Sequence, residues 1–100
     1  TRLRHVLVAV HDEAGNVGVA EAPVRPTIYG ETVESVQAII RLLEPALVGL
    51  AVDDVATQQA VLARVPNNHC AKGALDLALC ELRAKARGAT LFEAERGERE

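Results

Sequence analysis

The sequence predicts an α+β domain in which an antiparallel β-meander precedes a bundle of three helices. Apolar residues alternate with period two near the N-terminus and follow helical spacing from about residue 33 onward, so strands and helices are segregated along the chain. At 100 residues the chain fits one small domain. Because it has no Trp or Met and only one Phe and one Tyr, we expect an aliphatic, alanine-rich core.

The first element is a β-hairpin over about residues 2–22. Its first strand places three valines on one face and Leu7 and Ala9 on the other, and a polar break at 12–16 precedes a second short apolar segment. A two-stranded ribbon is marginal in water, so a third strand or a partner surface is expected beside the first strand. Pro23 and Pro26 are expected to end the hairpin, which leaves residues 23–31 as an ordered loop.

Three amphipathic helices follow. Thr32 is a good N-cap for the first, which Pro45 closes or kinks and Gly49 stops. The second begins at Asp53 or Asp54 and ends before Pro66.

The third helix is predicted over residues 69–87, with Asn67 or Asn68 as its cap. Basic residues in its last turns, among them Arg83, are accounted for by the helix dipole. Residues 93–100 carry six charges in eight positions, so they are predicted to be a charged tail or linker after a domain at 1–92.

Composition excludes several classes of partner. A net charge of −3 disfavours nucleic acid, and no apolar run approaches the ~20 residues that span a bilayer. Cys70 and Cys80 lie about 15 Å apart along one helix and cannot pair, so we expect free thiols and a cytoplasmic protein. Without a Cys-x-x-Cys motif, a zinc site is not expected.

Candidate catalytic residues are few. Ser35, the only serine, lies in a helix without a nucleophile elbow, and the three histidines, His5, His11 and His69, are too scattered to share a metal. Asp76 interrupts an apolar run and needs a partner, which Lys72 or a backbone amide could supply. Residue chemistry therefore predicts no catalytic residue and no metal ligand, although a small enzyme using Asp76 and His69 stays open as a weaker hypothesis.

Three segments together resemble a known family. Gly18–Pro23 (Gly-Val-Ala-Glu-Ala-Pro), Tyr29–Thr32 (Tyr-Gly-Glu-Thr) and the alanine-rich helix from Asn67 to Gly88, with Lys85-Ala-Arg-Gly88 at its end, are similar to the N-terminal capping domain of the enolase superfamily, in its mandelate racemase and muconate-lactonising group. The similarity spans about residues 3–92. The sequence departs from the family at Cys80, Glu81 and Thr90, where an aromatic residue, Asp and Pro are usual.

The resemblance implies a cap that packs on a (β/α)-barrel. In such enzymes the barrel abstracts a proton α to a carboxylate and holds Mg²⁺, while loops of the cap close over the substrate. The matching loop here would contribute five substrate-capping residues: Val24, Arg25, Thr27, Ile28 and Tyr29. Of these, Ile28 and Tyr29 are the strongest candidates for contact with the substrate. That these residues only anchor the loop on the helices is an equal alternative. The family's first strand would precede Thr1, so the cap is expected to be incomplete at its N-terminus.

The first functional hypothesis is the cap of a Mg²⁺-dependent cycloisomerase, epimerase or racemase that acts on a small carboxylate. No barrel of roughly 250 residues can be present in this chain, so it is expected to be inactive alone and to bind no metal itself. Its partner would be a barrel of the same or another chain, in a homo-oligomer. The alternative is a stand-alone, non-catalytic interaction module that pairs through its open sheet edge and an apolar helix face.

Overall fold

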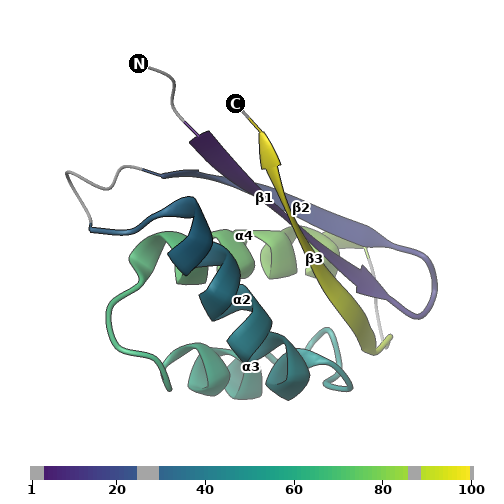
Figure 1. Cartoon of the computed structure of the whole chain (residues 1–100). Coiled ribbons are helices and arrows are strands. Elements are labelled where there is room, and N and C mark those ends of the chain that lie inside the picture. Colours follow the sequence, from purple (N-terminus) through teal and green to yellow (C-terminus); the bar gives the residue numbers. More distant parts are fainter. Residues whose placement is uncertain (1–3, 25–29, 86–88, 100) are drawn as a thin grey trace.

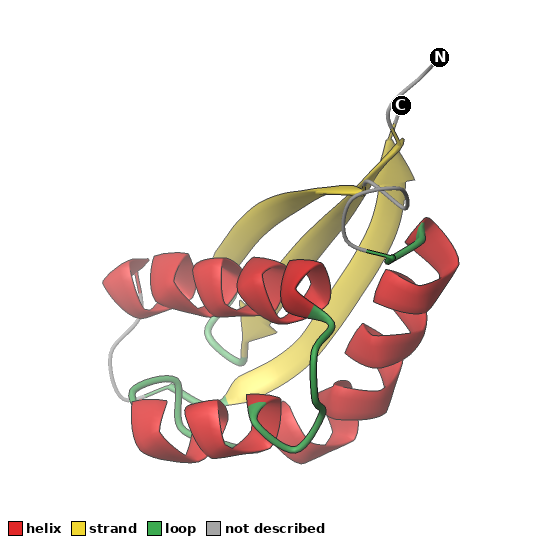
Figure 2. Ribbon diagram, turned by 90° about the vertical axis from the view of Figure 1, so that its left-hand side faces the viewer, coloured by secondary structure: helices red, strands yellow, loops and turns green. Residues whose placement is uncertain are grey.

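The computed structural model describes residues 4–24, 30–85 and 89–99 (Figure 1). In this part of the chain, β1 (Arg4–Asp12), β2 (Val17–Val24) and β3 (Leu91–Arg99) form an antiparallel sheet in the order β2-β1-β3. The described helices are α2 (Val33–Leu47), α3 (Val55–Leu62) and α4 (His69–Lys85). They gather on one side of the curved sheet (Figure 2), so the predicted α+β class is confirmed.

The sheet buries one face of its central strand. Val6, Val8 and Val10 are at most 1% exposed, whereas Leu7 and Ala9 on the opposite face are half-buried. Strand β2 runs through Pro23, which the sequence predicted as the end of the hairpin. Because β2 lies at the edge of the sheet, a residue without an N–H is tolerated there.

The C-terminal segment differs most from its prediction. Residues 93–99, expected as a charged tail or linker, belong to β3, which pairs with β1 from Asp12↔Leu91 to His5↔Arg99. The third strand that the hairpin required is therefore supplied by the end of the chain, and the edge of β1 predicted to be open is occupied. Backbone pairing and the burial of Leu91 and Ala94 hold this strand, and neither depends on a run of apolar residues.

The helices begin close to where the sequence placed them. Thr32 caps α2 in a reciprocal pair of hydrogen bonds with Ser35, which gives that serine a structural role. Helix α2 continues through Pro45 to Leu47, and Asp54 caps α3 through the backbone N–H of Thr57.

A close contact joins the sheet to α4. Gly18 of β2 lies so near this helix that a Cβ atom added to it would be 2.1 Å from the carbonyl oxygen of Ala78. The glycine therefore lets the strand and the helix meet backbone to backbone.

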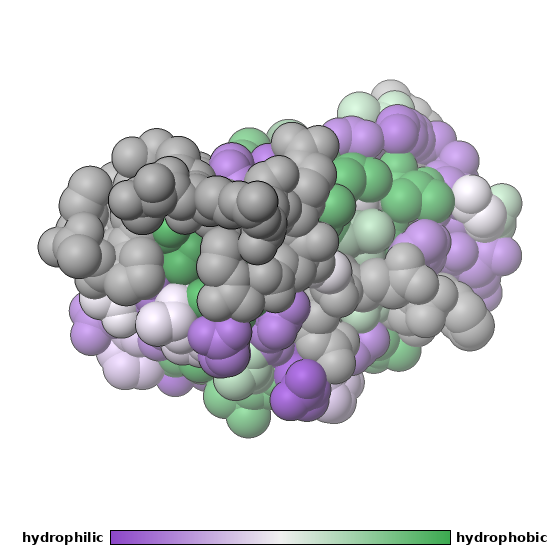
Figure 3. Space-filling model, turned by 45° about the horizontal axis from the view of Figure 1, so that its top comes forward, coloured by the Kyte–Doolittle hydropathy of each residue, from purple (hydrophilic) through white to green (hydrophobic). Residues whose placement is uncertain are grey.

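The core on the helix side of the sheet is aliphatic, as predicted. Ile40, Leu75, Leu79 and Leu82 are its largest fully buried apolar side chains. The opposite side of the sheet also carries apolar residues, since Val19 is 46% exposed beside half-buried Ala9. Viewed from the side of the chain ends, one group of hydrophobic atoms is bordered by hydrophilic ones, and further hydrophobic atoms lie elsewhere on this face (Figure 3).

Candidate functional site

The predicted substrate-capping residues lie at the exit of β2. Val24 ends the strand and is 4% exposed within the core. Arg25, Thr27, Ile28 and Tyr29 lie outside the described residues, so their part in a site stays a prediction. What the structure describes is the two ends of this segment, at Val24 and at Gly30.

The second end is fixed by Glu31. This residue is 6% exposed, and both of its carboxylate oxygens accept the backbone N–H of Cys70, at 3.1 Å each. Cys70 lies in the first turn of α4, where backbone N–H groups lack partners within the helix and the helix dipole favours a negative charge. Gly30 precedes the contact with φ of +70°, and Thr32 follows it as the cap of α2. Glu31 and Thr32 thus connect this part of the chain to α4 and α2.

The Glu31 contact also affects the thiol beside it. Burial of Cys70, and next the negative charge of Glu31, raise the pKa of this thiol, so it stays protonated at neutral pH. Neither Cys70 nor the exposed Cys80 forms a disulfide in the part of the chain that the structure describes. A protonated, half-buried thiol is a poor nucleophile.

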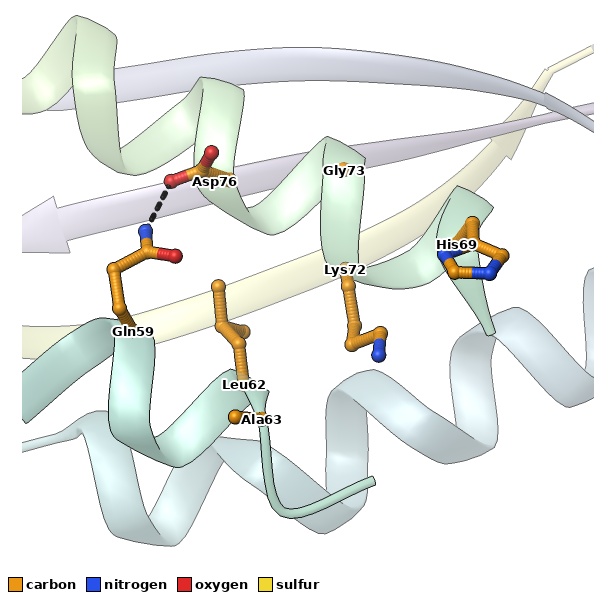
Figure 4. Close-up of a pocket in the computed structure, with 7 residues that line it drawn as sticks. All are labelled: Gln59, Leu62, Ala63, His69, Lys72, Gly73 and Asp76. Atoms are coloured by element: carbon orange, nitrogen blue, oxygen red, sulfur yellow. Dashed lines mark hydrogen bonds between the residues drawn. The ribbon is translucent and has the colours of Figure 1, made fainter. Parts of the chain in front are cut away.

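A groove of about 320 Å³ lies between α3 and α4 (Figure 4). Asp76 lines it and accepts a 2.7 Å hydrogen bond from Nε2 of Gln59. Lys72, one of the predicted partners of Asp76, instead donates from Nζ to the carbonyl oxygen of Val65 at 2.8 Å. His69 lines the same groove but stands seven residues from Asp76, about 10 Å along the helix. The groove therefore does not bring together the His69–Asp76 pair that a small enzyme would require.

His5, another candidate, lies beside a carboxylate of the neighbouring strand. Nδ1 of His5 lies 2.6 Å from Oε1 of Glu21 across β1 and β2. Among the described residues, no group of three or more His, Cys, Asp or Glu side chains is placed to hold a metal ion. No helix in the described ranges is long and apolar enough to cross a membrane.

Sequence reasoning missed one buried polar network. The Gln58 side chain is fully buried, donates from Nε2 to the carbonyl oxygens of Ala51 and Val52, and accepts a 2.6 Å hydrogen bond from Arg83. Arg83 thus has a specific partner besides the helix dipole. A glutamine in a short helix carries no sequence signal for this role, because the groups that it satisfies come from elsewhere in the fold.

The sequence and the fold of this chain are similar to those of known proteins. Residues 1–94 match the family model of the mandelate racemase and muconate lactonizing enzyme N-terminal domain. The crystal structure of a muconate lactonizing enzyme from Mycobacterium smegmatis, in complex with muconolactone, is similar with a TM-score of 0.76 and 44% identity over 79% of this chain.

Two curated relatives are epimerases. The chain is 28% identical over 93 residues to a D-Ala-D/L-Ala epimerase of Cytophaga hutchinsonii and 31% identical over 93 residues to an L-Ala-D/L-Glu epimerase of Clostridium acetobutylicum, matches that cover 92% and 88% of it. It spans about a quarter of the length of these relatives: 25% of each epimerase and 22% of the muconate lactonizing enzyme. This chain therefore belongs to the N-terminal domain family of the mandelate racemase and muconate lactonizing enzymes, within the enolase superfamily.

Proposed function

We propose that this chain is the substrate-capping domain of a longer cycloisomerase, epimerase or racemase that acts on a small carboxylate. The observation that carries the proposal is the family match over residues 1–94 by a chain that spans only a quarter of its relatives. The remaining three quarters of such an enzyme would supply the barrel, which would belong to the same chain or to another. Homo-oligomeric assembly of the enzyme is also part of the proposal. A cytoplasmic location is also part of the proposal, because neither Cys70 nor Cys80 forms a disulfide in the described structure.

In this proposal the segment after β2 faces the substrate. The contacts with the substrate would come from Arg25, Thr27, Ile28 and Tyr29. Val24 would be the buried residue that holds the start of the segment in the core. Support comes from the two described ends, since Val24 is held in the core and Glu31 is bonded to α4. Loops held at both ends by a rigid scaffold are common carriers of binding residues.

The chemistry would lie outside this chain. Mg²⁺ bound in the barrel would stabilise the enediolate formed when a proton α to the carboxylate is abstracted. The described residues offer no donor set for that ion, so no metal ligand and no proton transfer are assigned to them. Identity of 44% to the muconate lactonizing enzyme, against 28% and 31% to the epimerases, makes muconate the first substrate to assay.

The test uses the longer natural protein and this 100-residue chain in parallel. With Mg²⁺ and a panel of muconate and dipeptides, the longer protein should turn over one class, and the chain alone should turn over none. In the longer protein, Tyr29→Ala should raise KM by about tenfold, a loss of one modest contact. Leu77→Ala on the exposed face of α4 is the control and should leave KM unchanged. Turnover by the chain alone, or an unchanged KM and substrate preference in Tyr29→Ala, would overturn the proposal.

A non-catalytic interaction module is the second candidate. Its predicted open edge on β1 is filled by β3, but Leu42 and Leu77 are 64% and 63% exposed on α2 and α4. These side chains are the surface that such a module would use. Sedimentation of the 100-residue chain across a range of protein concentrations separates the two candidates. The module predicts self-association of this chain that Leu77→Ala or Leu42→Ala removes, whereas the first candidate assigns homo-oligomeric assembly to the longer protein.

A further inference from the structure

We infer, independently of the proposed function, that Glu81 and Lys85 of α4 close the free edge of β2 against pairing with a strand of a second copy of this chain. Strand β2 has β1 on one side, and the described sheet places no strand on its other side. Backbone N–H and C=O groups along such an edge are a template for strand addition unless other groups cover them.

The hairpin register determines which backbone groups of β2 point away from β1. The Asp12 N–H donates to the Asn16 carbonyl oxygen at 3.1 Å, so position 16 bonds across the hairpin. Hydrogen-bonded and non-hydrogen-bonded positions alternate along an antiparallel pair. The even-numbered positions of β2 therefore bond to β1, and the odd-numbered ones, from Val17 to Pro23, direct their backbone groups to the free edge.

Two side chains of α4 bond to this edge. Nζ of Lys85 donates to the carbonyl oxygen of Val17 at 2.9 Å, across 68 residues of sequence, and to Oε1 of Glu81 at 2.9 Å. The Glu81 carboxylate also accepts a hydrogen bond from the backbone of Val19. Farther along the same edge, Pro23 has no N–H to offer to another strand. The helix and the proline thus remove donors and acceptors that a second strand would need.

The close approach at Gly18 brings α4 within reach of the edge. Gly18 lies between the two valines whose backbone groups are bonded, and the atoms nearest to a Cβ added there belong to Ala78 and Leu82. Glu81 and Lys85 lie one turn apart on the same side of α4, so both side chains can reach the strand from there. The helix therefore covers the part of the edge that lies nearest the hairpin turn.

The exposure of the pair favours this role over a stabilising one. The side chains of Lys85 and Glu81 are 49% and 42% exposed, and exposed ion pairs contribute little to folding stability. The hydrogen bond from Lys85 is the main cause that holds the pKa of Glu81 below its ordinary value of 4.5. Burial opposes this effect, while the charge of Lys85 and the Val19 backbone add to it. Glu81 is therefore ionised at neutral pH, where it accepts hydrogen bonds from both.

The first experiment measures self-association of the 100-residue chain by sedimentation velocity. The double variant Glu81→Ala/Lys85→Ala loses one negative and one positive charge, so its net charge stays at −3. It should lower the protein concentration at which half of the chains are dimeric by about tenfold or more, because its bared edge can pair with a second copy.

Single variants grade the effect and control for charge. Lys85→Ala leaves the bond between Glu81 and Val19 in place, so it should associate less than the double variant. Lys85→Arg keeps a donor and a positive charge and should associate as wild type does. Arg41→Ala, at an exposed position of α2, is the matched control, because it changes the net charge as Lys85→Ala does and should not promote association.

The second experiment tests whether β2 is the surface that pairs. In the double variant the Val19 amide loses its acceptor, so it should exchange hydrogen faster than in wild type at low protein concentration. At high concentration a strand of the second copy should accept this N–H, and exchange should slow again.

Three outcomes would overturn the inference. The first is a double variant that associates no more than wild type, whatever its Val19 exchange rate. The second is association that does not slow Val19 exchange, because another surface would then be responsible. The third concerns stability: if the double variant has a lowered urea midpoint, and the core variant Val61→Ala with a similar midpoint associates equally, then association follows from unfolding.

Discussion

At the scale of single residues, the contact between Gly18 and α4 leaves no room for a side chain at position 18. The nearest atoms to an added Cβ are backbone atoms, the Ala78 carbonyl oxygen at 2.1 Å and the Leu82 nitrogen at 2.7 Å. Backbone atoms in a packed helix cannot rotate away as a flexible side chain can. A methyl group at this position must therefore push strand and helix apart.

Gly18→Ala is predicted to destabilise the chain by about 1–3 kcal/mol, the usual range for overpacking a tight core. Urea unfolding followed by circular dichroism measures this. Gly73→Ala is the matched control, since Gly73 lies in α4 with no atom within 4 Å of an added Cβ. It should stabilise the chain by up to ~1 kcal/mol through helix propensity. Equal midpoints for the two variants would show that β2 does not approach α4 this closely.

At the scale of elements, the hairpin turn depends on one carboxylate. Oδ1 of Asp12 accepts the backbone N–H groups of Ala14 and Asn16, and its Oδ2 accepts the side-chain amide of Asn16. Burial acts to raise the pKa of Asp12, but hydrogen bonds from the side chain and backbone of Asn16 and from the backbones of Ala14 and Gly15 outweigh it. The pKa of Asp12 therefore lies below its ordinary value of 3.8.

This direction fixes the pH dependence of the turn. A lowered pKa in the folded state means that ionised Asp12 stabilises the fold fully above its ordinary pKa. That stability is lost as pH falls below 3.8 and through the folded-state value. The difference in urea midpoint between wild type and Asp12→Asn should be constant near neutral pH and should shrink in this acidic range. A difference that stays constant down to the most acidic pH studied would contradict the role of the charge.

Elements with a strong periodic pattern were predictable from the sequence, and one without such a pattern was not. Helix α4 repeats apolar residues on one face, and Thr32 is a typical N-cap that indicates the start of α2. The sequence therefore predicted both helices to within a few residues of their bounds. The sequence predicted a tail in place of β3 because the partner of this strand is β1, which lies 79 to 94 residues earlier, and the stability of β3 comes from that pairing. The prediction that Pro23 ends the hairpin was wrong for a related reason. A proline is tolerated in β2 only because this strand lies at the edge of the sheet.

The substrate-capping role of residues 25–29 stays a prediction. The segment after β2 followed from family resemblance, whereas its anchoring by Glu31 requires knowledge that α4 begins beside that residue. Gln58 and Arg83 illustrate the same limit, because their partners are distant in sequence. Contacts of this kind are set by tertiary structure and leave no local pattern to read.

At the scale of the whole molecule, β3 closes the sheet with the last residues of the chain. Its first residues are bonded outside the sheet as well, since Leu91 exchanges backbone hydrogen bonds with Gly49 and Leu50, and Glu44 of α2 accepts the Ala94 N–H. Beyond Ala94 the strand pairs with β1 from Ala9 back to His5. The two halves of β3 should therefore contribute differently to the stability of the chain and to its monomeric state.

Chains ending at Ala94 and at Thr90 are predicted to separate these contributions. The chain 1–94 keeps the buried Leu91 and Ala94 and exposes the edge of β1, so it should fold but self-associate as concentration rises. The chain 1–90 also loses the burial of Leu91, worth about 1.5–3 kcal/mol, and should be less stable as well. Sedimentation velocity and urea unfolding measure the two effects.

Adding a peptide of residues 91–100 should return the chain 1–90 towards the monomer, because the peptide can fill the vacant edge of β1. If both truncated chains stay monomeric with the midpoint of the full chain, then β3 contributes nothing to the fold, and the sheet would be a hairpin stabilised by the helices alone.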